Sequence, residues 1–278
     1  MIKIAYFDCF AGISGNMILG ALLDAGLDLK RLQAELAGLR LDGYRIVPEL
    51  VRRNSIRATY VSVEIEEQGV ERHLHDIKEI IKGSELPPPV KAQSMSIFAR
   101  LAEAEARVHG EPIEHIHFHE VGAMDAIVDI VGSVTGLWIL GVQEVHASHV
   151  HVGRGTIECA HGIIPVPAPA TAELLKGVPI YGRDVDAELV TPTGAAFLME
   201  LATSFGSGPA MRVDRVGYGA GTRELPFPNL LRVSIGETVD RTNPQEPTEA
   251  GKPPDAQTNS HRHHHHHHHD HHDHEQGK

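Results

Sequence analysis

The spacing of hydrophobic and polar residues changes several times along the chain, as is typical of alternating strands and helices. Residues 2–8, "IKIAYFD", form an apolar run of strand length, and the glycine-rich segment "CFAGISG" follows. In "NMILGALLDAG" the apolar residues recur at helical spacing, and a glycine ends the pattern. The chain is therefore predicted to begin with a strand, a turn and a helix. A second short helix is expected over residues 29–39.

Strands and helices also alternate in the middle of the chain. The segment "YRIVPELVRRNSIRATYVSVEI" predicts a β-hairpin with its turn near Asn54 and Ser55. Helices are predicted for "HDIKEIIKG", for residues 90–109 and for the segment with apolar residues from Ile127 to Trp138. The alternation in "EVHASHVHV" predicts a strand, which "GRG" is expected to turn back into "TIECA".

The last part of the pattern predicts two helices and two closing strands. The helices are "PVPAPATAELLKG", with prolines at its start, and "TPTGAAFLMELATSFG", with Thr191 or Thr193 as N-cap. The strands are "MRVDRVGYGAG" and "NLLRVSIGE". The predicted fold class is α/β (mixed α+β), a mixed sheet with flanking helices. We expect a globular region over 1–237, a disordered linker over 238–260 and a histidine-rich tail over 261–278.

Composition narrows the functional classes. The 278 residues carry a formal net charge of −12, which is a poor electrostatic match for nucleic acid. No run of about 18 apolar residues occurs, so no membrane span is expected. Two cysteines in a chain of this length do not form a disulfide framework. These features predict a cytoplasmic protein that binds neither nucleic acid nor membrane.

Histidine is the most over-represented residue type. The chain has 21 histidines, and eleven of them lie between positions 261 and 274. Neutral imidazole binds Ni(II), Cu(II), Zn(II) and Co(II), so the tail is predicted to capture metal with little selectivity. An expression tag is the alternative interpretation of this run. The predicted tail ligands are His261, His263, His264, His265, His266, His267, His268, His269, His271, His272 and His274.

A second group of metal-capable side chains lies in "HIHFHEVGAMDAIVD". If the segment is extended, His115, His117 and His119 share one face; if it is helical, His115 and His119 are neighbours. Asp125 and Asp129 are four residues apart on the following helix and share a face. A metal or phosphate site and a solvated polar face both fit this pattern.

A third group lies in "HASHVHVGRGTIECAHG". On a strand His149 and His151 share a face, and the predicted hairpin sets His149 opposite Cys159. Histidine and cysteine together can ligate zinc or nickel, although a free cysteine is more often a small core residue. Near the N-terminus, the turn after Asp8 can offer backbone N–H groups to an anion, and Asp8 can meet a cation or a ribose.

Five segments, in this order, closely resemble the LarC family of nickel-insertion proteins. They are "YFDCFAGISGNMILGALLD", "HFHEVGAMDAIVDIVG", "HGIIPVPAPATAELLKG", "ELVTPTGAA" and "GYGAGTRELPFPNLLRV". The resemblance covers residues 1–237, and the histidine-rich segment also fits it. It implies insertion of Ni(II) into pyridinium-3,5-bisthiocarboxylic acid mononucleotide by a CTP-dependent cyclometallation assisted by Mn(II) or Mg(II). The product is the nickel-pincer nucleotide, the cofactor of lactate racemase and related enzymes, and the enzyme class is a lyase.

The resemblance also implies partners and site residues. The expected partners are the pyridinium mononucleotide, the family's C-terminal domain, the nickel-pincer-dependent racemase and a second copy of the chain in a homo-oligomer. A base must take the ring proton when the carbon–nickel bond forms, and the candidates are His119, Glu120 and Asp125. The internal metal relay would use His115, His117, His119, Asp125, Asp129, His149 and His151. The residues proposed to hold the nucleotide are Asp8, Gly12, Ser14, Gly15, Asn16, Arg154 and Arg223.

Two departures from the family pattern qualify these expectations. The family's first motif usually has an acid where Asn16 stands in "GISGNM", so a cation site there is weakened. The C-terminal domain associated with CTP and nickel is not part of this sequence, so we expect the chain to be the N-terminal portion. The leading hypothesis is a nickel-insertion enzyme or part of one. A non-catalytic nickel chaperone or storage protein is the second hypothesis, and a metal-dependent hydrolase is the third.

Overall fold

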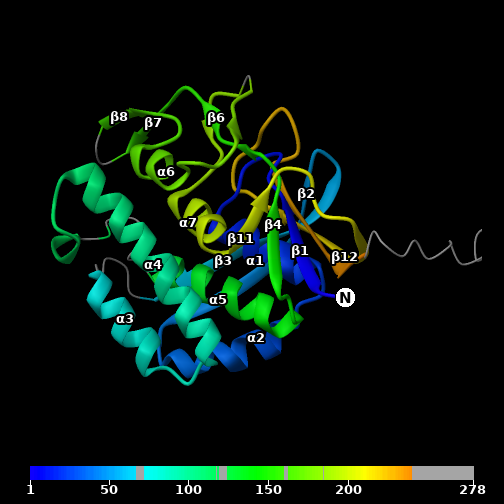
Figure 1. Cartoon of the computed structure of the whole chain (residues 1–278), viewed down its shortest axis with the longest axis horizontal. Coiled ribbons are helices and arrows are strands. Elements are labelled where there is room, and N and C mark those ends of the chain that lie inside the picture. Colours follow the sequence, from blue (N-terminus) through cyan, green and yellow to red (C-terminus); the bar gives the residue numbers. More distant parts are fainter. Residues whose placement is uncertain (67–71, 117, 119–123, 160–161, 184, 240–278) are drawn as a thin grey trace, which may run out of the picture. The chain divides into compact units, whose positions relative to one another are not determined.

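The computed structural model describes residues 1–66, 72–116, 118, 124–159, 162–183 and 185–239. Within these residues, seven α-helices accompany a seven-stranded mixed sheet, which confirms the predicted mixed α/β class (Figure 1). The predicted linker and histidine-rich tail lie outside the described residues, apart from the start of the linker. None of the described helices is long and apolar enough to cross a membrane.

The central sheet combines a parallel part with an antiparallel part, in the order β11-β4-β1-β13-β12-β3-β2. Strands β1, β4 and β11 run parallel to one another, whereas β13 pairs antiparallel with both β1 and β12. The carboxyl ends of β1, β4 and β11 therefore meet at one edge of the sheet. The bounds are β1 Lys3–Asp8, β4 Glu144–Ala147, β11 Ala202–Phe205, β12 Met211–Ala220 and β13 Leu230–Thr238.

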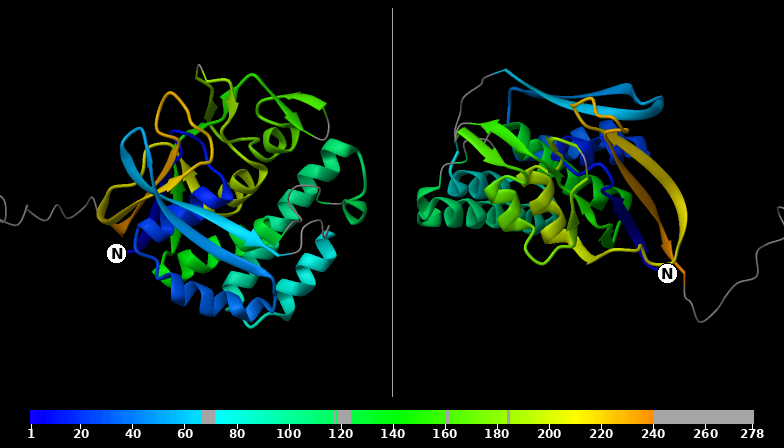
Figure 2. Two further views of the ribbon diagram at one scale, coloured as in Figure 1. Left: turned by 180° about the vertical axis from the view of Figure 1, so that it is seen from behind. Right: turned by 90° about the horizontal axis from the view of Figure 1, so that it is seen from above.

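The predicted hairpin is confirmed as β2 Tyr44–Arg53 and β3 Ile56–Ile65. Its turn residues Asn54 and Ser55 have φ angles of 45° and 69°, the left-handed pair that a two-residue hairpin turn requires. The hairpin extends past the rest of the sheet as a long two-stranded ribbon beside α1 (Figure 2).

The helices agree with the predicted segments, with two corrections: α6 covers only Pro169–Leu174 of the helix predicted over 165–177, and α7 ends earlier than predicted. Thr191 caps α7, because its hydroxyl accepts a hydrogen bond from the N–H of Gly194 at 3.2 Å. The helix ends at Leu201 and "ATSF" forms strand β11, so the longer helix predicted there is wrong. Threonine and phenylalanine favour strands, and β11 gains β4 as a partner. The helices are α1 Gly15–Asp24, α2 Leu29–Leu36, α3 Leu74–Gly83, α4 Pro88–His109, α5 Met124–Leu140, α6 Pro169–Leu174 and α7 Pro192–Leu201, with 3₁₀ turns η1 Ala37–Leu39 and η2 Ile113–His115.

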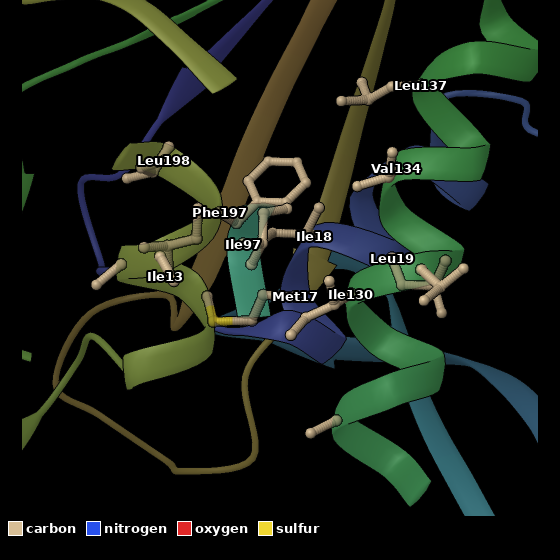
Figure 3. Packing of buried hydrophobic residues seen from close by; sticks show 14 of the residues in the cluster. Ile13, Met17, Ile18, Leu19, Ile97, Ile130, Val134, Leu137, Phe197 and Leu198 are labelled. Carbon is tan, nitrogen blue, oxygen red and sulfur yellow. The ribbon is translucent and has the colours of Figure 1, made fainter. Parts of the chain in front are cut away.

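The main hydrophobic core lies where α1 packs against α5 and against β12 and β3 of the sheet. Figure 3 shows side chains of α1, α5 and α7 meeting there, including Ile18, Ile130 and Phe197. Phe197 also meets Phe7 of β1 edge to face, with ring centroids 5.6 Å apart. Each such side chain stabilises the fold by about 1.5–3 kcal/mol. The start of α1 is thus held firmly between the sheet and α5.

The segment after β4 differs from its prediction. Instead of one strand folding back on itself, β5 Val150–His151 pairs with β9 Ile180–Tyr181, and β6 Gly153–Arg154 pairs with β10 Ala187–Glu188. Strand β7 Thr156–Cys159 pairs with β8 Gly162–Pro165. The predicted hairpin that set His149 opposite Cys159 is therefore wrong. Two of the three short strands find partners more than twenty-five residues away, which local alternation does not reveal.

Candidate functional site

The glycine-rich turn between β1 and α1 is fastened to other parts of the protein. Its Cys9 N–H donates to the Ser148 hydroxyl at 2.9 Å, and the Ile13 N–H donates to the Leu189 carbonyl at 2.9 Å. Gly12 has a φ of +85°, and a Cβ there would stand 1.9 Å from the Leu189 oxygen. Gly12 is thus required by close approach to the protein's own backbone. Anion binding by Gly12 stays a prediction.

The residues at the start of α1 also bond within the protein. The Ser14 hydroxyl donates to the Asn16 amide oxygen at 2.6 Å, and the Asn16 amide nitrogen donates to the Ala220 carbonyl at 3.4 Å. A carboxylate at position 16 could not make the second bond, so Asn16 suits this surrounding. A Cβ at Gly15 would stand 2.7 Å from a carboxylate oxygen of Asp129, so Gly15 allows α1 and α5 to meet.

Asp125 and Asp129 form a pair with unequal environments on α5. Asp125 is exposed, and its carboxylate accepts a hydrogen bond from the Ala126 N–H at 2.8 Å. The Asp129 Oδ1 is buried and has no hydrogen-bond partner among the described residues. Burial, and secondly the charge of Asp125, raise the pKa of Asp129 to about 8. Asp129 is therefore mostly protonated at neutral pH, and a metal ion binding there would have to displace the proton.

The histidine segment before α5 is only partly described. His115 is exposed and ends the short η2 turn, so the extended alternative does not hold at this residue. Ile116 and Phe118 are buried, and Phe118 meets Phe98 of α4 edge to face. His117, His119 and Glu120 lie outside the described residues, so their predicted roles remain predictions.

His151 is a fully buried histidine with both ring nitrogens engaged. Its Nδ1 bonds to the Phe10 carbonyl at 2.9 Å, and its Nε2 accepts a hydrogen bond from the Arg183 N–H at 3.1 Å. Burial is the main reason that the pKa of His151 is lowered, and the Arg183 charge also lowers it. The ring stacks on Tyr181 with centroids 4.8 Å apart. In this structure neither nitrogen is free for a metal.

A cavity of about 440 Å³ opens at the carboxyl ends of β1, β4 and β11. It brings together two residues that the sequence singled out, Asp8 and His149. His149 is exposed, whereas Asp8 forms an ion pair with Arg232. Sequence reasoning missed the other chemical groups, because no spacing pattern marks them. The complete lining is Tyr6, Asp8, Ser148, His149, Tyr181, Arg183, Gly206 and Ser207.

The two arginines predicted to hold a phosphate lie outside this cavity. Arg154 is exposed and pairs with Asp186, with Nε and Oδ1 3.1 Å apart. Arg223 lines a different cavity, of about 430 Å³, together with Cys159 and Glu188. The structure therefore does not gather Arg154, Arg223 and Asp8 at one site.

Metal-capable side chains are dispersed over the part of the chain that the structure describes. Within it, no three or more His, Cys, Asp or Glu residues form a group that could hold a metal ion. The eleven histidines of the tail and the histidines at 117, 119 and 161 are outside that part. The described residues thus supply a largely buried acid and a polar cavity, but no complete metal centre.

Comparisons with known proteins agree on one family. A family model described as "Nickel insertion protein" matches residues 5–261. The chain is 56% identical over 250 residues to a protein of Desulfitobacterium hafniense (strain DSM 10664 / DCB-2) named "Pyridinium-3,5-bisthiocarboxylic acid mononucleotide nickel insertion protein". That alignment covers 90% of this chain and 62% of the relative.

Further relatives have the same kind of name. A "Putative nickel insertion protein" of Dictyoglomus thermophilum is 46% identical over 240 residues, which are 86% of this chain and 62% of the relative. Another, of Thermomicrobium roseum, is 52% identical over 238 residues, which are 84% and 58%. The chain thus spans less than two thirds of the length of these relatives. No solved structure matches the chain significantly.

Proposed function

Because the chain belongs to the nickel insertion protein family, we propose that it is part of an enzyme that inserts Ni(II) into pyridinium-3,5-bisthiocarboxylic acid mononucleotide. The observation that carries this proposal is the 56% identity to the Desulfitobacterium protein of that name over 90% of this chain. The chain spans 62% of that relative, and we propose that the insertion reaction also uses the family's C-terminal domain. The product is the nickel-pincer cofactor of lactate racemase-type enzymes.

The chemistry requires a proton acceptor near the pyridinium ring. When nickel bonds to a ring carbon, the carbon–hydrogen bond breaks and the proton passes to a base. The proposed bases are His119, Glu120 and Asp125. Asp129, one turn after Asp125 on α5, adds a second candidate, because burial and secondly the charge of Asp125 raise its pKa to about 8. A carboxyl with a pKa of about 8 can take up and release a proton near neutral pH.

CTP and a divalent cation are the finer part of the proposal, as is the assignment to the lyases. Mn(II) and Mg(II) prefer several oxygen ligands, chiefly carboxylates. The described residues do not fit such a cation, since no three acidic or histidine side chains converge among them. We therefore assign CTP and its cation to the separate C-terminal domain or to residues outside the described ones.

The histidine-rich tail is proposed to capture Ni(II) before its insertion. Eleven imidazoles within fourteen residues offer many alternative ligand sets, so binding is expected to be abundant and reversible. The same observation favours a second candidate function, a nickel chaperone or store without catalysis. The two candidates differ in whether a nickelated nucleotide is formed.

The decisive experiment incubates the full chain with the dithiolated pyridinium mononucleotide, Ni(II), CTP and Mn(II). One series contains a family C-terminal domain and the other does not, and mass spectrometry detects the nickelated product. Product only in the presence of the added domain identifies the chain as a partial enzyme. Absence of product in both series, with nickel bound to the chain, supports the chaperone instead.

A further inference from the structure

The cavity of about 440 Å³ occupies the position where sheets of this kind bind ligands. Asp8 ends β1, Ser148 and His149 directly follow β4, and Gly206 and Ser207 directly follow β11. These three strands are parallel, and ligands of open α/β sheets bind outside the carboxyl ends of such strands. The volume is within the range of small-molecule sites.

The cavity carries one positive charge, Arg183, for which no partner of opposite sign is found among the described residues. Its only described acid, Asp8, is already paired with Arg232. Arg183 lies over the Tyr181 ring, with its guanidinium carbon 5.3 Å from the ring centroid. Among the described residues, no carboxylate forms an ion pair with Arg183. An exposed guanidinium without a carboxylate partner is suited to an anionic ligand, above all to phosphate.

The backbone of Arg183 is held in place. The Arg183 N–H donates to Nε2 of His151, while the Arg183 carbonyl accepts a hydrogen bond from the Val185 N–H at 2.7 Å. His151 is itself fixed by the Phe10 carbonyl and by stacking on Tyr181. Fixing the backbone of a binding residue in advance reduces the entropy lost when a ligand binds. His151 thus links the glycine-rich turn to the charged residue of the cavity.

We propose that this cavity binds the phosphate of a pyridinium mononucleotide, with Arg183 as the anion-binding residue and His151 as a positioning residue. The identity of the ligand rests on the proposed function. One unpaired guanidinium matches a single phosphate. A nucleoside triphosphate needs several cationic groups or a metal ion, and the described lining offers neither. His149 and Ser207 stand beside the phosphate as further hydrogen-bond donors.

The test measures dissociation constants by calorimetry for three probes in the absence of nickel. The probes are nicotinic acid mononucleotide, its riboside without the phosphate, and CTP with Mg(II). The variants are Arg183→Gln, Arg183→Lys and His151→Gln. The matched control is Arg31→Gln, an exposed arginine of α2. Circular dichroism establishes that each variant is folded at the temperature used.

Arg183→Gln is expected to weaken binding of the mononucleotide at least about tenfold and to change binding of the riboside less than about twofold. Arg183→Lys retains part of the affinity, because it keeps the charge but loses the planar fork. His151→Gln weakens the mononucleotide selectively, a pattern that general destabilisation does not produce. Arg31→Gln binds all three probes as the wild type does.

The inference is overturned if wild type and Arg183→Gln bind the mononucleotide equally, or if wild type does not bind it at millimolar concentration. Equal loss of mononucleotide and riboside, or dependence on Arg183 for CTP alone, also overturns it. Phosphate-selective binding in a chain that never gives nickelated product, with or without the C-terminal domain, refutes the proposed function and leaves the site intact.

Discussion

Two pairs of residues share their order of burial but differ in chemistry. One is Asp125 with Asp129 on α5, and the other is His149 with His151 after β4. Each pair consists of like residues whose spacing predicts a shared face. In each, the first residue is exposed and the second is largely or fully buried. The buried residues differ in their partners. His151 uses both ring nitrogens in hydrogen bonds with the main chain, whereas Asp129 Oδ1 has no partner among the described residues.

The comparison teaches that burial removes charge from both residues but leaves them with different roles. Burial disfavours the ionised form, so it lowers the pKa of His151 and raises the pKa of Asp129. A neutral histidine with both nitrogens bonded is fixed and serves to position Arg183. A neutral carboxyl without a partner for Oδ1 keeps a proton that it can exchange. The number and nature of partners, rather than spacing, separates the two cases.

The largest predicted change in the free energy of unfolding comes from replacing His151, whose two ring nitrogens are both hydrogen-bonded. We expect His151→Leu to lower the free energy of unfolding by about 3 kcal/mol, because the Arg183 N–H and the Phe10 carbonyl, both partly buried, lose their hydrogen-bond partner. Urea unfolding at pH 7.5 measures this change. The matched variant His149→Leu, at an exposed position, should change stability by no more than about 0.5 kcal/mol. Equal effects of the two variants would contradict the distinction within the pair.

The second prediction replaces the Asp129 carboxyl with a neutral amide, so that no charge can form at this position at any pH. We expect Asp129→Asn to stabilise the protein at pH 7 by roughly 2 kcal/mol, less than the full pKa shift implies because the carboxyl is partly exposed. Between pH about 4 and 8 the folded carboxyl keeps a proton that the unfolded chain has released. Stability therefore falls as the pH rises through this window, and the variant should lose that slope.

The free energy of unfolding is expected to depend on pH in the opposite direction for His151, which distinguishes it from Asp129. Its lowered pKa means that below pH about 6.5 the unfolded chain takes up a proton that the folded chain refuses, so stability falls as the pH drops. Urea unfolding at several pH values separates the two contributions in the variants. The control Asp42→Asn should leave stability and its pH dependence nearly unchanged, since Asp42 is exposed and does not contribute to the raised pKa of Asp129. An unaltered pH dependence in Asp129→Asn would refute the raised pKa.

The sequence predicted most of the fold because its long elements have strong periodicity of their own. The hairpin at Asn54 and Ser55 and the Thr191 cap follow from local rules. The segment from β5 to β8 escaped prediction because two of its strands have partners distant in sequence. The site was predicted less well for the same reason. Asp8 and His149 were singled out separately. Tyr181 and Arg183 lie beside them because β9 pairs with β5 and because the Arg183 N–H bonds to His151, and local sequence patterns reveal neither contact.

The third prediction tests whether Asp125, His117 and His119 belong to a reaction centre. If it does, Asp125→Ala should fold normally and lose nickel insertion by a factor of at least about ten, equivalent to about 1.4 kcal/mol of transition-state stabilisation. His117→Ala and His119→Ala are expected to behave in the same way. Product formation with the C-terminal domain present is measured by mass spectrometry. Wild-type rates in all three variants would move the search for the base away from α5.

The smallest predicted effect on stability concerns histidines that the sequence places beyond the globular region. Removing residues 261–274 should change the free energy of unfolding by no more than about 0.5 kcal/mol, because a predicted disordered tail contributes nothing to the core. The same deletion should remove most of the bound nickel, since imidazoles that are neutral above pH about 6.5 supply most of the expected ligands. Equilibrium dialysis with Ni(II) at pH 7.5 measures the stoichiometry, and replacing the same segment with a serine-rich one of equal length controls for length. Full nickel loading of the truncated chain would show that residues outside the deleted segment bind the metal without it.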